Sequence, residues 1–222
     1  MSFKAVIFDL DGVLLSTDRY HYRAWKQLAD REGIYFNEAI NERLRGVSRM
    51  ESLEIILERA AKTYSAPEKE AMATLKNSIY RQLLESLTPA DIFPGVIELL
   101  DALDRCGIKK AVGSSSKNAG FILEKTGLNR WFEGAVCDGN NISRSKPDPQ
   151  VFLLAAEMLG IAPVDCLAVE DAEAGILAAK AAGMMAMGVG AAAGLPQCDL
   201  SAVDIAAAGR MITEQVELYA QV

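Results

Sequence analysis

Short, mostly apolar runs alternate with helical patterns along most of this chain. The runs contain no polar alternation and cover residues 5–8, 109–113, 134–137, 166–169 and 184–189. Such runs are typical of buried parallel strands. The segments between the later runs carry apolar residues at helical spacing, at 95–106, 118–126, 148–159 and 172–182. This alternation predicts a three-layer, Rossmann-like α/β fold with a parallel sheet and right-handed connections.

The segment 16–88 interrupts the alternation and contains no strand pattern. Apolar residues recur there at helical intervals in 18–33, 50–64 and 67–87. We expect Asp18 to be the N-cap of the first of these helices and Pro67 to begin the third. The segment therefore predicts a helical cap domain, 16–88, inserted over a core domain formed by 1–15 and 89–222.

The last part of the chain is rich in alanine. Its pattern predicts a short strand at 203–205 and a helix that begins at Ile212. The glycines of 188–194 have the wrong spacing for a dinucleotide-binding fingerprint and come late in the fold. We therefore reject a dinucleotide site.

The composition is that of a globular protein with ample material for a core. Of 222 residues, 50% are apolar and 24% are charged, and the formal net charge is -7. This acidic balance argues against nucleic acid or an anionic membrane surface as a partner. No apolar run approaches the roughly 18 residues of a membrane span. We expect a monomer that acts on a small molecule.

The chain has four cysteines in no CxxC pair, and we recognise no signal-peptide pattern. These features predict reduced, buried thiols in a cytoplasmic protein. The cysteines are Cys106, Cys137, Cys166 and Cys198. The chain has one histidine, His21, so polyhistidine metal sites are excluded and any histidine-centred triad would have to use His21.

Pairs of carboxylates follow two of the predicted strands. Asp9 and Asp11 come directly after the first, and strand periodicity directs residues i and i+2 to the same side. Glu170 and Asp171 come after the run at 166–169. Because ligands of open α/β sheets bind at the carboxyl edge, we expect these side chains in one site. Their charges require a cation or a shared proton.

The same edge offers groups that bind anions. Ser114 and Ser115 follow the run at 109–113 and precede a helix, where hydroxyls and backbone N–H groups form an anion site, although helix capping alone would explain them. Lys146, also before a helix, supplies a cation. Carboxylates, Mg²⁺, a lysine and an anion site together are what phosphoryl transfer requires. The natural nucleophile is a carboxylate, with the second carboxylate as general acid and base.

The ordered set Asp9-Leu10-Asp11-Gly12-Val13, Ser114, Lys146-Pro147 and Glu170-Asp171 resembles the four signature motifs of the haloacid dehalogenase superfamily. The resemblance covers essentially the whole chain. It implies that Asp9 is the nucleophile and Asp11 the acid/base, and that Ser114 and Lys146 bind the transferring phosphoryl group. It also implies that Mg²⁺ is held by Asp9, Asp11 through its backbone carbonyl, Glu170 and Asp171.

Residues of the cap resemble the β-phosphoglucomutase subfamily in particular. The stretches that match are 17–25, 41–49 and 116–118, with Ser52 and the pair Lys76-Asn77 beside them. A mutase must hold a second, non-reacting phosphate, and Arg49 is its natural donor, completed by the stretch 116–118. Cap closure would exclude water. The resemblance implies substrate contacts from Thr17, His21, Trp25, Gly46, Val47, Arg49, Ser52, Lys76, Ser116, Lys117 and Asn118.

Four of these assignments have simpler alternatives. Arg49 could be a solvated arginine at a helix start, and His21 could be packed at the base of the cap helix. Trp25 could belong to the cap core, and Lys76 could be one more exposed helical lysine. The chain also departs from the subfamily pattern at Ser16, at Gly113 and in the stretch 138–142.

The resemblance implies a Mg²⁺-dependent mutase that interconverts β-glucose 1-phosphate and glucose 6-phosphate through β-glucose 1,6-bisphosphate. One rival is a sugar-phosphate phosphatase of the same superfamily, with the same core and a cap that admits water. A second rival is a non-catalytic sensor of a phosphorylated ligand. The intact Asp9, Asp11 and Lys146 argue against the sensor, which has no need of a nucleophile.

Overall fold

The computed structural model describes residues 3–44, 47–132 and 134–220. The chain forms two compact units, Met1–Ser16 with Thr88–Val222, and Thr17–Leu87. We call the first the core unit and the second the cap unit. The sequence pattern places these divisions at 15/16 and 88/89.

The core unit is built on one parallel sheet, which confirms the predicted fold class. The strand order is β3-β2-β1-β4-β5-β6. Phe8 of β1 is level with Val112 of β2 and Val169 of β4. This register brings the carboxyl ends of the three strands to one edge of the sheet. The strands are β1 (Ala5–Phe8), β2 (Lys109–Gly113), β3 (Val136–Cys137), β4 (Cys166–Glu170), β5 (Met185–Val189) and β6 (Leu200–Ala202).

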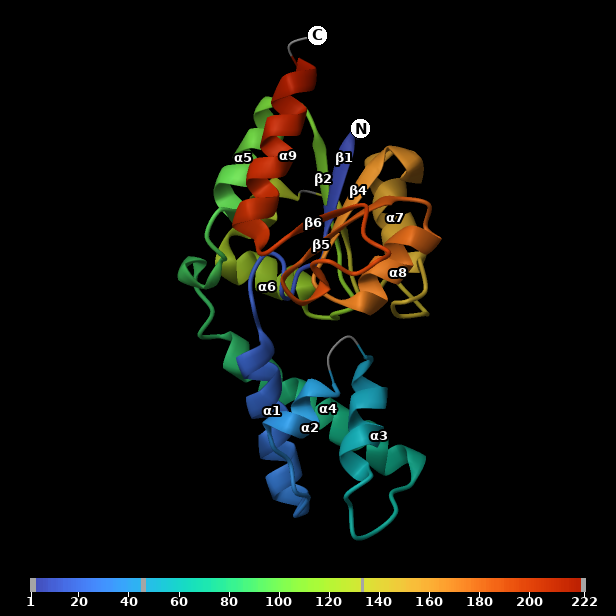
Figure 1. Ribbon diagram of the computed structural model, residues 1–222. Helices are drawn as coiled ribbons and strands as arrows, with labels where there is room; N and C mark the ends of the chain where they lie inside the picture. The colour runs from blue at the N-terminus through green and yellow to red at the C-terminus, as the bar shows by residue number, and fades with distance from the viewer. Residues whose placement is uncertain (1–2, 45–46, 133, 221–222) are drawn as a thin grey trace. The chain divides into compact units, whose positions relative to one another are not determined.

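Helices cover both faces of this sheet (Figure 1). On one face α5 and α9 pack against each other. On the other, Phe152 of α7 and Ile176 of α8 share a buried cluster with Ile7 and Ala168 of the sheet. The helices of the core unit are α5 (Val96–Arg105), α6 (Ala119–Thr126), α7 (Gln150–Leu159), α8 (Glu173–Ala181) and α9 (Ile205–Ala220). Short 3₁₀ helices span Pro89–Asp91, Leu128–Trp131, Pro163–Asp165 and Gly190–Ala192.

The cap unit is helical, and its described residues, 17–44 and 47–87, contain no strand. Its helices are α1 (Asp18–Glu32), α2 (Glu38–Glu42), α3 (Arg49–Leu57) and α4 (Ala66–Leu84). Trp25 and Leu28 of α1 share a buried cluster with Leu53 and Ile56 of α3 and Met72 of α4. The apolar stripes that predicted the helices are therefore the surfaces that hold the cap together.

The helix boundaries in the cap differ from the sequence prediction. Thr17, rather than Asp18, is the N-cap residue of α1, and its hydroxyl accepts a hydrogen bond from Tyr80 (2.8 Å) instead of capping the helix. α3 ends at Leu57 instead of residue 64. The next residue, Glu58, forms an ion pair with Arg43 (2.7 Å). The short α2 was missed because five residues show no clear period.

The predicted boundaries of the last strand and the last helix were wrong. The last strand is Leu200–Ala202 rather than 203–205, and α9 begins at Ile205 rather than Ile212. The side chain of Asp204 accepts a hydrogen bond from the Ala207 N–H (2.7 Å), as an N-cap does. The alanines that follow are strong helix formers, and they continue the helix from this point.

All four cysteines are free, as expected, but they are not all buried. Cys137 and Cys166 are buried, and burial raises the pKa of each thiol to about 11. Cys106 and Cys198 are partly exposed, contrary to the prediction. Over the part of the chain that the structure describes, no helix is long and apolar enough to cross a membrane.

Candidate active site

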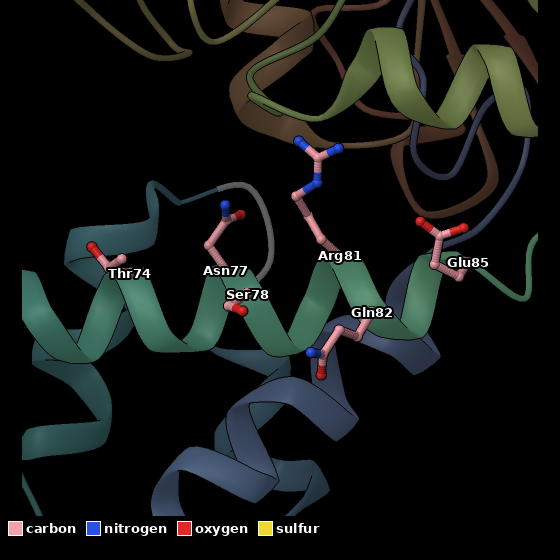
Figure 2. A pocket seen from close by; sticks show the side chains of 6 residues that line it. All are labelled: Thr74, Asn77, Ser78, Arg81, Gln82 and Glu85. Carbon is pink, nitrogen blue, oxygen red and sulfur yellow. The ribbon is translucent and has the colours of Figure 1, made fainter.

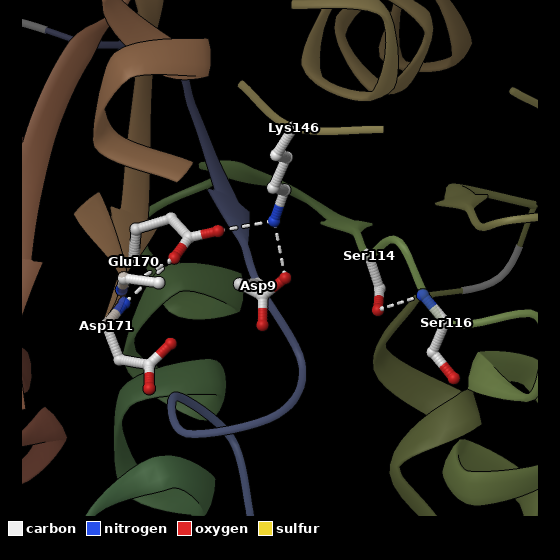
Figure 3. Close-up of polar contacts among 7 residues, drawn as sticks. Asp9, Ser114, Ser116, Lys146, Glu170 and Asp171 are labelled. Carbon is white, nitrogen blue, oxygen red and sulfur yellow. Dashed lines mark hydrogen bonds and ion pairs between the residues drawn. The ribbon is translucent and has the colours of Figure 1, made fainter. Parts of the chain in front are cut away.

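The carboxyl edge of the sheet brings together side chains from three strands (Figure 3). Asp9 continues β1, and its N–H donates to the Val169 carbonyl of β4 (2.9 Å). Glu170 is the last residue of β4, and Ser114 follows β2. Side chains that lie up to 161 positions apart in a chain of 222 residues are thus neighbours because parallel strands end together.

Lys146 lies between two of the carboxylates. Its ammonium group donates to Asp9 Oδ1 at 2.5 Å and also to Glu170 Oε1 (Figure 3). The side chains of Lys146 and Glu170 are almost fully buried. Burial by itself lowers the pKa of Lys146, but the carboxylates of Asp9 and Glu170 outweigh it and raise that pKa. Lys146 is therefore held as a cation.

The second oxygen of Glu170 is directed into the start of α8. Glu170 Oε2 accepts hydrogen bonds from the N–H groups of Asp171 (3.0 Å) and Ala172 (3.1 Å). Space for the carboxylate comes from Gly175, where a Cβ would lie 1.9 Å from the carboxyl carbon of Glu170. A glycine in this helix is therefore a steric requirement of the site.

Asp171 carries the clearest sign of excess negative charge. Burial, together with the charges of Asp9, Glu170 and Asp11, raises the pKa of Asp171 to about 8. Its carboxylate lies against Gly12, where a Cβ would be 2.0 Å from Asp171 Oδ2. Gly12 has a φ of 90°, which also favours glycine. The turn after β1 is therefore shaped around this carboxylate.

The donor set fits a hard divalent cation. The groups are all oxygens, they carry more negative charge than Lys146 neutralises, and Gly12 and Gly175 leave room for them. Within the described residues, no three His, Cys, Asp or Glu side chains yet converge closely enough to hold a metal ion. Lys146 instead contacts two of the four predicted ligands, Asp9 and Glu170.

The loop after β2 is ordered by its own serines. Ser114 is buried, and its Oγ accepts from the Ser116 N–H (3.1 Å, Figure 3). Ser116 Oγ accepts from the N–H of Asn118 (3.2 Å), the residue before α6. Ser115 and Lys117 are exposed. Apart from Lys146, the predicted phosphate residues of the core thus form one continuous loop, Ser114–Asn118, which we call the phosphate loop.

Two of the predicted cap residues, His21 and Trp25, meet at Lys76, which is buried rather than an exposed helical lysine. Its ammonium group lies 2.8 Å from His21 Nδ1 and over the rings of Trp25 (4.8 Å) and Tyr80 (4.6 Å). An ammonium group can only donate, so Nδ1 accepts and the imidazole proton is on Nε2. Trp25 belongs to the cap core, and Thr17 is bonded to Tyr80. This arrangement is a polar cluster inside a helical unit.

Arg49 begins α3 and is tied to α4. Its Nη2 donates to Asn77 Oδ1 (2.8 Å), and burial lowers the pKa of its guanidinium. Ser52 is buried one turn further along α3, whereas Val47 is exposed. Gly46 lies outside the described residues.

A pocket of about 400 Å³ lies along α4, and Asn77 and Arg81 project from the same side of the helix there (Figure 2). The residues that line it all have polar side chains: Thr74, Asn77, Ser78, Arg81, Gln82 and Glu85. Asn77, which holds Arg49, is therefore also part of this pocket.

Several residues that shape these sites were not among the predicted site residues. Tyr80 contacts Thr17 and Lys76, and Asn77 holds Arg49. Gly175 makes space for Glu170. A helical glycine so close to the acidic pair was a usable signal, because glycine weakens a helix unless packing requires it. No local pattern marks Tyr80, since its hydrogen-bond partner, Thr17, lies 63 positions away in the chain.

Gly175→Ala should destabilise the protein. The new methyl group must displace the Glu170 carboxylate, and overpacking of this kind costs about 1–3 kcal/mol. Gly120→Ala, an exposed position in α6 where an added Cβ would meet no atom within 4 Å, is the matched control and should be neutral or up to about 1 kcal/mol stabilising. Urea denaturation of both variants measures the difference. Equal stabilities would contradict the packing account.

His21 should remain neutral at pH 6.5, where an exposed histidine is half protonated. Burial and the nearby charges of Lys76 and Arg49 lower its pKa. Because the folded-state pKa is depressed, stability is intact above about pH 6.5 and is lost as the pH falls below it. NMR titration follows this single imidazole directly. We expect Lys76→Met to raise its pKa, and a wild-type pKa of about 6.5 or above would contradict the burial argument.

Comparison with known proteins adds an independent line of support. Residues 3–183 match the haloacid dehalogenase-like hydrolase family. The chain is 48% identical over 189 residues to β-phosphoglucomutase of Bacillus subtilis (strain 168), covering 84% of this chain and 83% of that protein. It is 31% identical over 184 residues to the phosphorylated carbohydrates phosphatase of Thermotoga maritima, covering 82% of each.

A solved structure of similar fold supports the same family. β-Phosphoglucomutase from Clostridium difficile has a TM-score of 0.88 at 38% identity, covering 99% of this chain and 100% of that one. The parallel sheet, the inserted helices and the family match confirm the resemblance seen in the motifs. The chain therefore belongs to the haloacid dehalogenase-like hydrolase family.

Proposed function

We propose that the chain is a Mg²⁺-dependent β-phosphoglucomutase, which interconverts β-glucose 1-phosphate and glucose 6-phosphate through β-glucose 1,6-bisphosphate. The observation that carries this proposal is the 48% identity to the Bacillus subtilis β-phosphoglucomutase over 189 residues. In a chain of 222 residues, a continuous match of that length includes Arg49 and Lys76 of the cap as well as the core. The similarity thus extends to the part of the chain that distinguishes one activity from another.

Asp9 is the proposed nucleophile. A carboxylate oxygen of Asp9 attacks phosphorus, the bond from phosphorus to the sugar oxygen breaks, and an aspartyl-phosphate forms. The contact with Lys146 supports this role, because an ammonium group beside Asp9 attracts the phosphoryl oxygens to that carboxylate. Ser114, on the neighbouring strand end, would donate to the same phosphoryl group.

Asp11 is the proposed acid and base. When the 6-hydroxyl of β-glucose 1-phosphate attacks the aspartyl-phosphate, Asp11 takes the proton of that hydroxyl, and the resulting bisphosphate reverses its orientation in the site. Asp9 then attacks the phosphate on O1, Asp11 gives the proton to O1 as it leaves, and glucose 6-phosphate departs with the aspartyl-phosphate formed again. Asp11 is half-buried and two residues from the nucleophile, and a catalyst of this kind contributes about 10²–10⁴ in rate.

Asp9, the Asp11 carbonyl, Glu170 and Asp171 are the proposed ligands of Mg²⁺, which would neutralise charge that develops on the phosphoryl oxygens. The raised pKa of Asp171 supports this assignment, since a cation would offset the burial and the repulsion from neighbouring carboxylates that together hold the pKa at about 8. Glu170 is fixed by two backbone N–H groups, so its carboxylate is already oriented.

The phosphate that is not being transferred needs its own site, because either end of the bisphosphate must be able to react. We assign Arg49 to it, together with Ser116, Lys117 and Asn118 of the phosphate loop. A guanidinium held by Asn77 offers a fixed, forked donor that suits a phosphate. Lys76, His21, Trp25, Thr17, Gly46, Val47 and Ser52 are the further proposed substrate contacts of the cap.

The second candidate is a sugar-phosphate phosphatase, favoured by the 31% identity to the Thermotoga maritima carbohydrate phosphatase. Both activities use an aspartyl-phosphate and the same core residues. They differ in the group that accepts the phosphoryl from Asp9, which is a sugar hydroxyl in the mutase and water in the phosphatase.

One assay separates the two. The protein is given β-glucose 1-phosphate, Mg²⁺ and a trace of β-glucose 1,6-bisphosphate, and glucose 6-phosphate and free phosphate are both quantified. We expect glucose 6-phosphate to be the main product and Asp9→Asn to form neither. Gly120→Ala serves as the matched control and should behave as the wild type, because that position is exposed and has no close neighbours.

Abundant free phosphate with little isomerised sugar would instead establish the phosphatase. Full activity of Asp9→Asn would reject the nucleophile assignment for either enzyme.

A further inference from the structure

The stretch after β3 departs from the subfamily pattern, and it forms a compact turn beside the phosphate loop. The Asn141 N–H donates to the Asp138 carbonyl (2.9 Å), which closes the turn. The Asp138 N–H donates to Asn141 Oδ1 (2.9 Å), and the Asn140 N–H donates to Asp138 Oδ1 (2.8 Å). Side chains and backbone thus hold Asp138–Asn141 in one conformation.

This turn contacts the phosphate loop at successive residues. The pairing of β2 with β3 ends where the Ser114 N–H donates to the Cys137 carbonyl (3.0 Å). Beyond the strands, the Gly139 N–H donates to the Ser116 carbonyl (3.1 Å). Asn140 Nδ2 donates to the Lys117 carbonyl (3.0 Å). The turn therefore extends the interaction between the two strands onto the loop.

The residue types in the turn suit its close contact with the phosphate loop. At Gly139 a Cβ would lie 2.5 Å from the Ser115 carbonyl oxygen and 3.0 Å from the Lys117 nitrogen, so the close approach requires glycine. An asparagine amide has two hydrogens on Nδ2, and both are used. One bonds the Lys117 carbonyl, and the other bonds Asp138 Oδ2 (3.2 Å), so Asp138 orients the amide of Asn140.

The hydrogen bonds to the Ser116 and Lys117 carbonyls also fix the orientation of the two peptide planes to which these carbonyls belong. The Ser116 carbonyl shares its peptide plane with the Lys117 N–H, and the Lys117 carbonyl shares its plane with the Asn118 N–H. Ser116, Lys117 and Asn118 are the residues assigned above to the non-transferring phosphate. Ser114 is held separately, through the β-ladder bond to Cys137.

We propose that Asn140 is a positioning residue that orients the Lys117–Asn118 peptide for the non-transferring phosphate of a sugar bisphosphate. This inference rests on the proposed function for the identity of that phosphate. Asn140 is exposed, so it is not needed to fill the core. An aspartate of the same size would lose both donors and place its charge beside the Lys117 carbonyl and the Asp138 carboxylate.

The test compares two substrates. β-Glucose 1,6-bisphosphate uses both phosphate sites, whereas p-nitrophenyl phosphate has one phosphoryl group and needs only the transfer site. For the bisphosphate, KM is the concentration that half-saturates the conversion of β-glucose 1-phosphate, and for p-nitrophenyl phosphate it is measured from the release of p-nitrophenol, each with Asn140→Asp and Asn140→Ala. The matched control is Asn129→Asp, which adds the same charge at an exposed position in the core unit.

We expect Asn140→Asp to raise KM for the bisphosphate about tenfold relative to KM for p-nitrophenyl phosphate, with Asn140→Ala intermediate and Asn129→Asp without effect on the ratio. An unchanged ratio of the two KM values in Asn140→Asp would overturn the proposal. An equal rise for both substrates would also overturn it, since that would be general damage to the core.

The outcome is separable from that of the proposed function. If the wild-type protein consumes the bisphosphate with release of free phosphate instead of isomerised sugar, the mutase assignment fails. The ratio of the two KM values still reports on Asn140 in that case, because the bisphosphate carries a second phosphate under either reaction.

Discussion

The contact of Lys146 with Asp9 and Glu170 is the interaction on which the rest of the core depends. Parallel strands that end together force carboxylates from β1 and β4 to the same edge, and buried charge is costly unless it is paired. Lys146 compensates two of these groups, the N–H groups at the start of α8 satisfy Glu170, and Gly12 and Gly175 make space. The loops and glycines around the sheet edge are consequences of this requirement.

The two units carry different parts of the proposed chemistry. The core gathers the acidic side chains of Asp9, Glu170 and Asp171, where burial and the neighbouring carboxylates raise the pKa of Asp171, and this arrangement suits a cation and a transferring phosphoryl group. The cap instead buries Lys76 beside a neutral His21 and holds Arg49 on Asn77. Fixed cations of this kind suit the charged and hydroxylated parts of a sugar phosphate.

Much of the core could be predicted from sequence because its signals are local. An apolar run followed by Asp9 and Asp11 indicates, within a few residues, a strand, the carboxyl edge of its sheet and two carboxylates that need a compensating cation. The signals that failed were those decided by distant contacts. Lys76 looks like any helical lysine until His21, Trp25 and Tyr80 surround it. The start of α9 was missed because apolar residues flank Asp204, so that this N-cap residue did not stand out in the sequence pattern.

The proposed mechanism requires Asp9 to carry the phosphoryl group. Sodium borohydride reduces an aspartyl-phosphate to homoserine, which mass spectrometry of the digested protein locates to a single position. After incubation with Mg²⁺ and β-glucose 1,6-bisphosphate, we expect homoserine at position 9 and aspartate retained at position 11. Homoserine at position 11, or at no position while substrate is consumed, would contradict it.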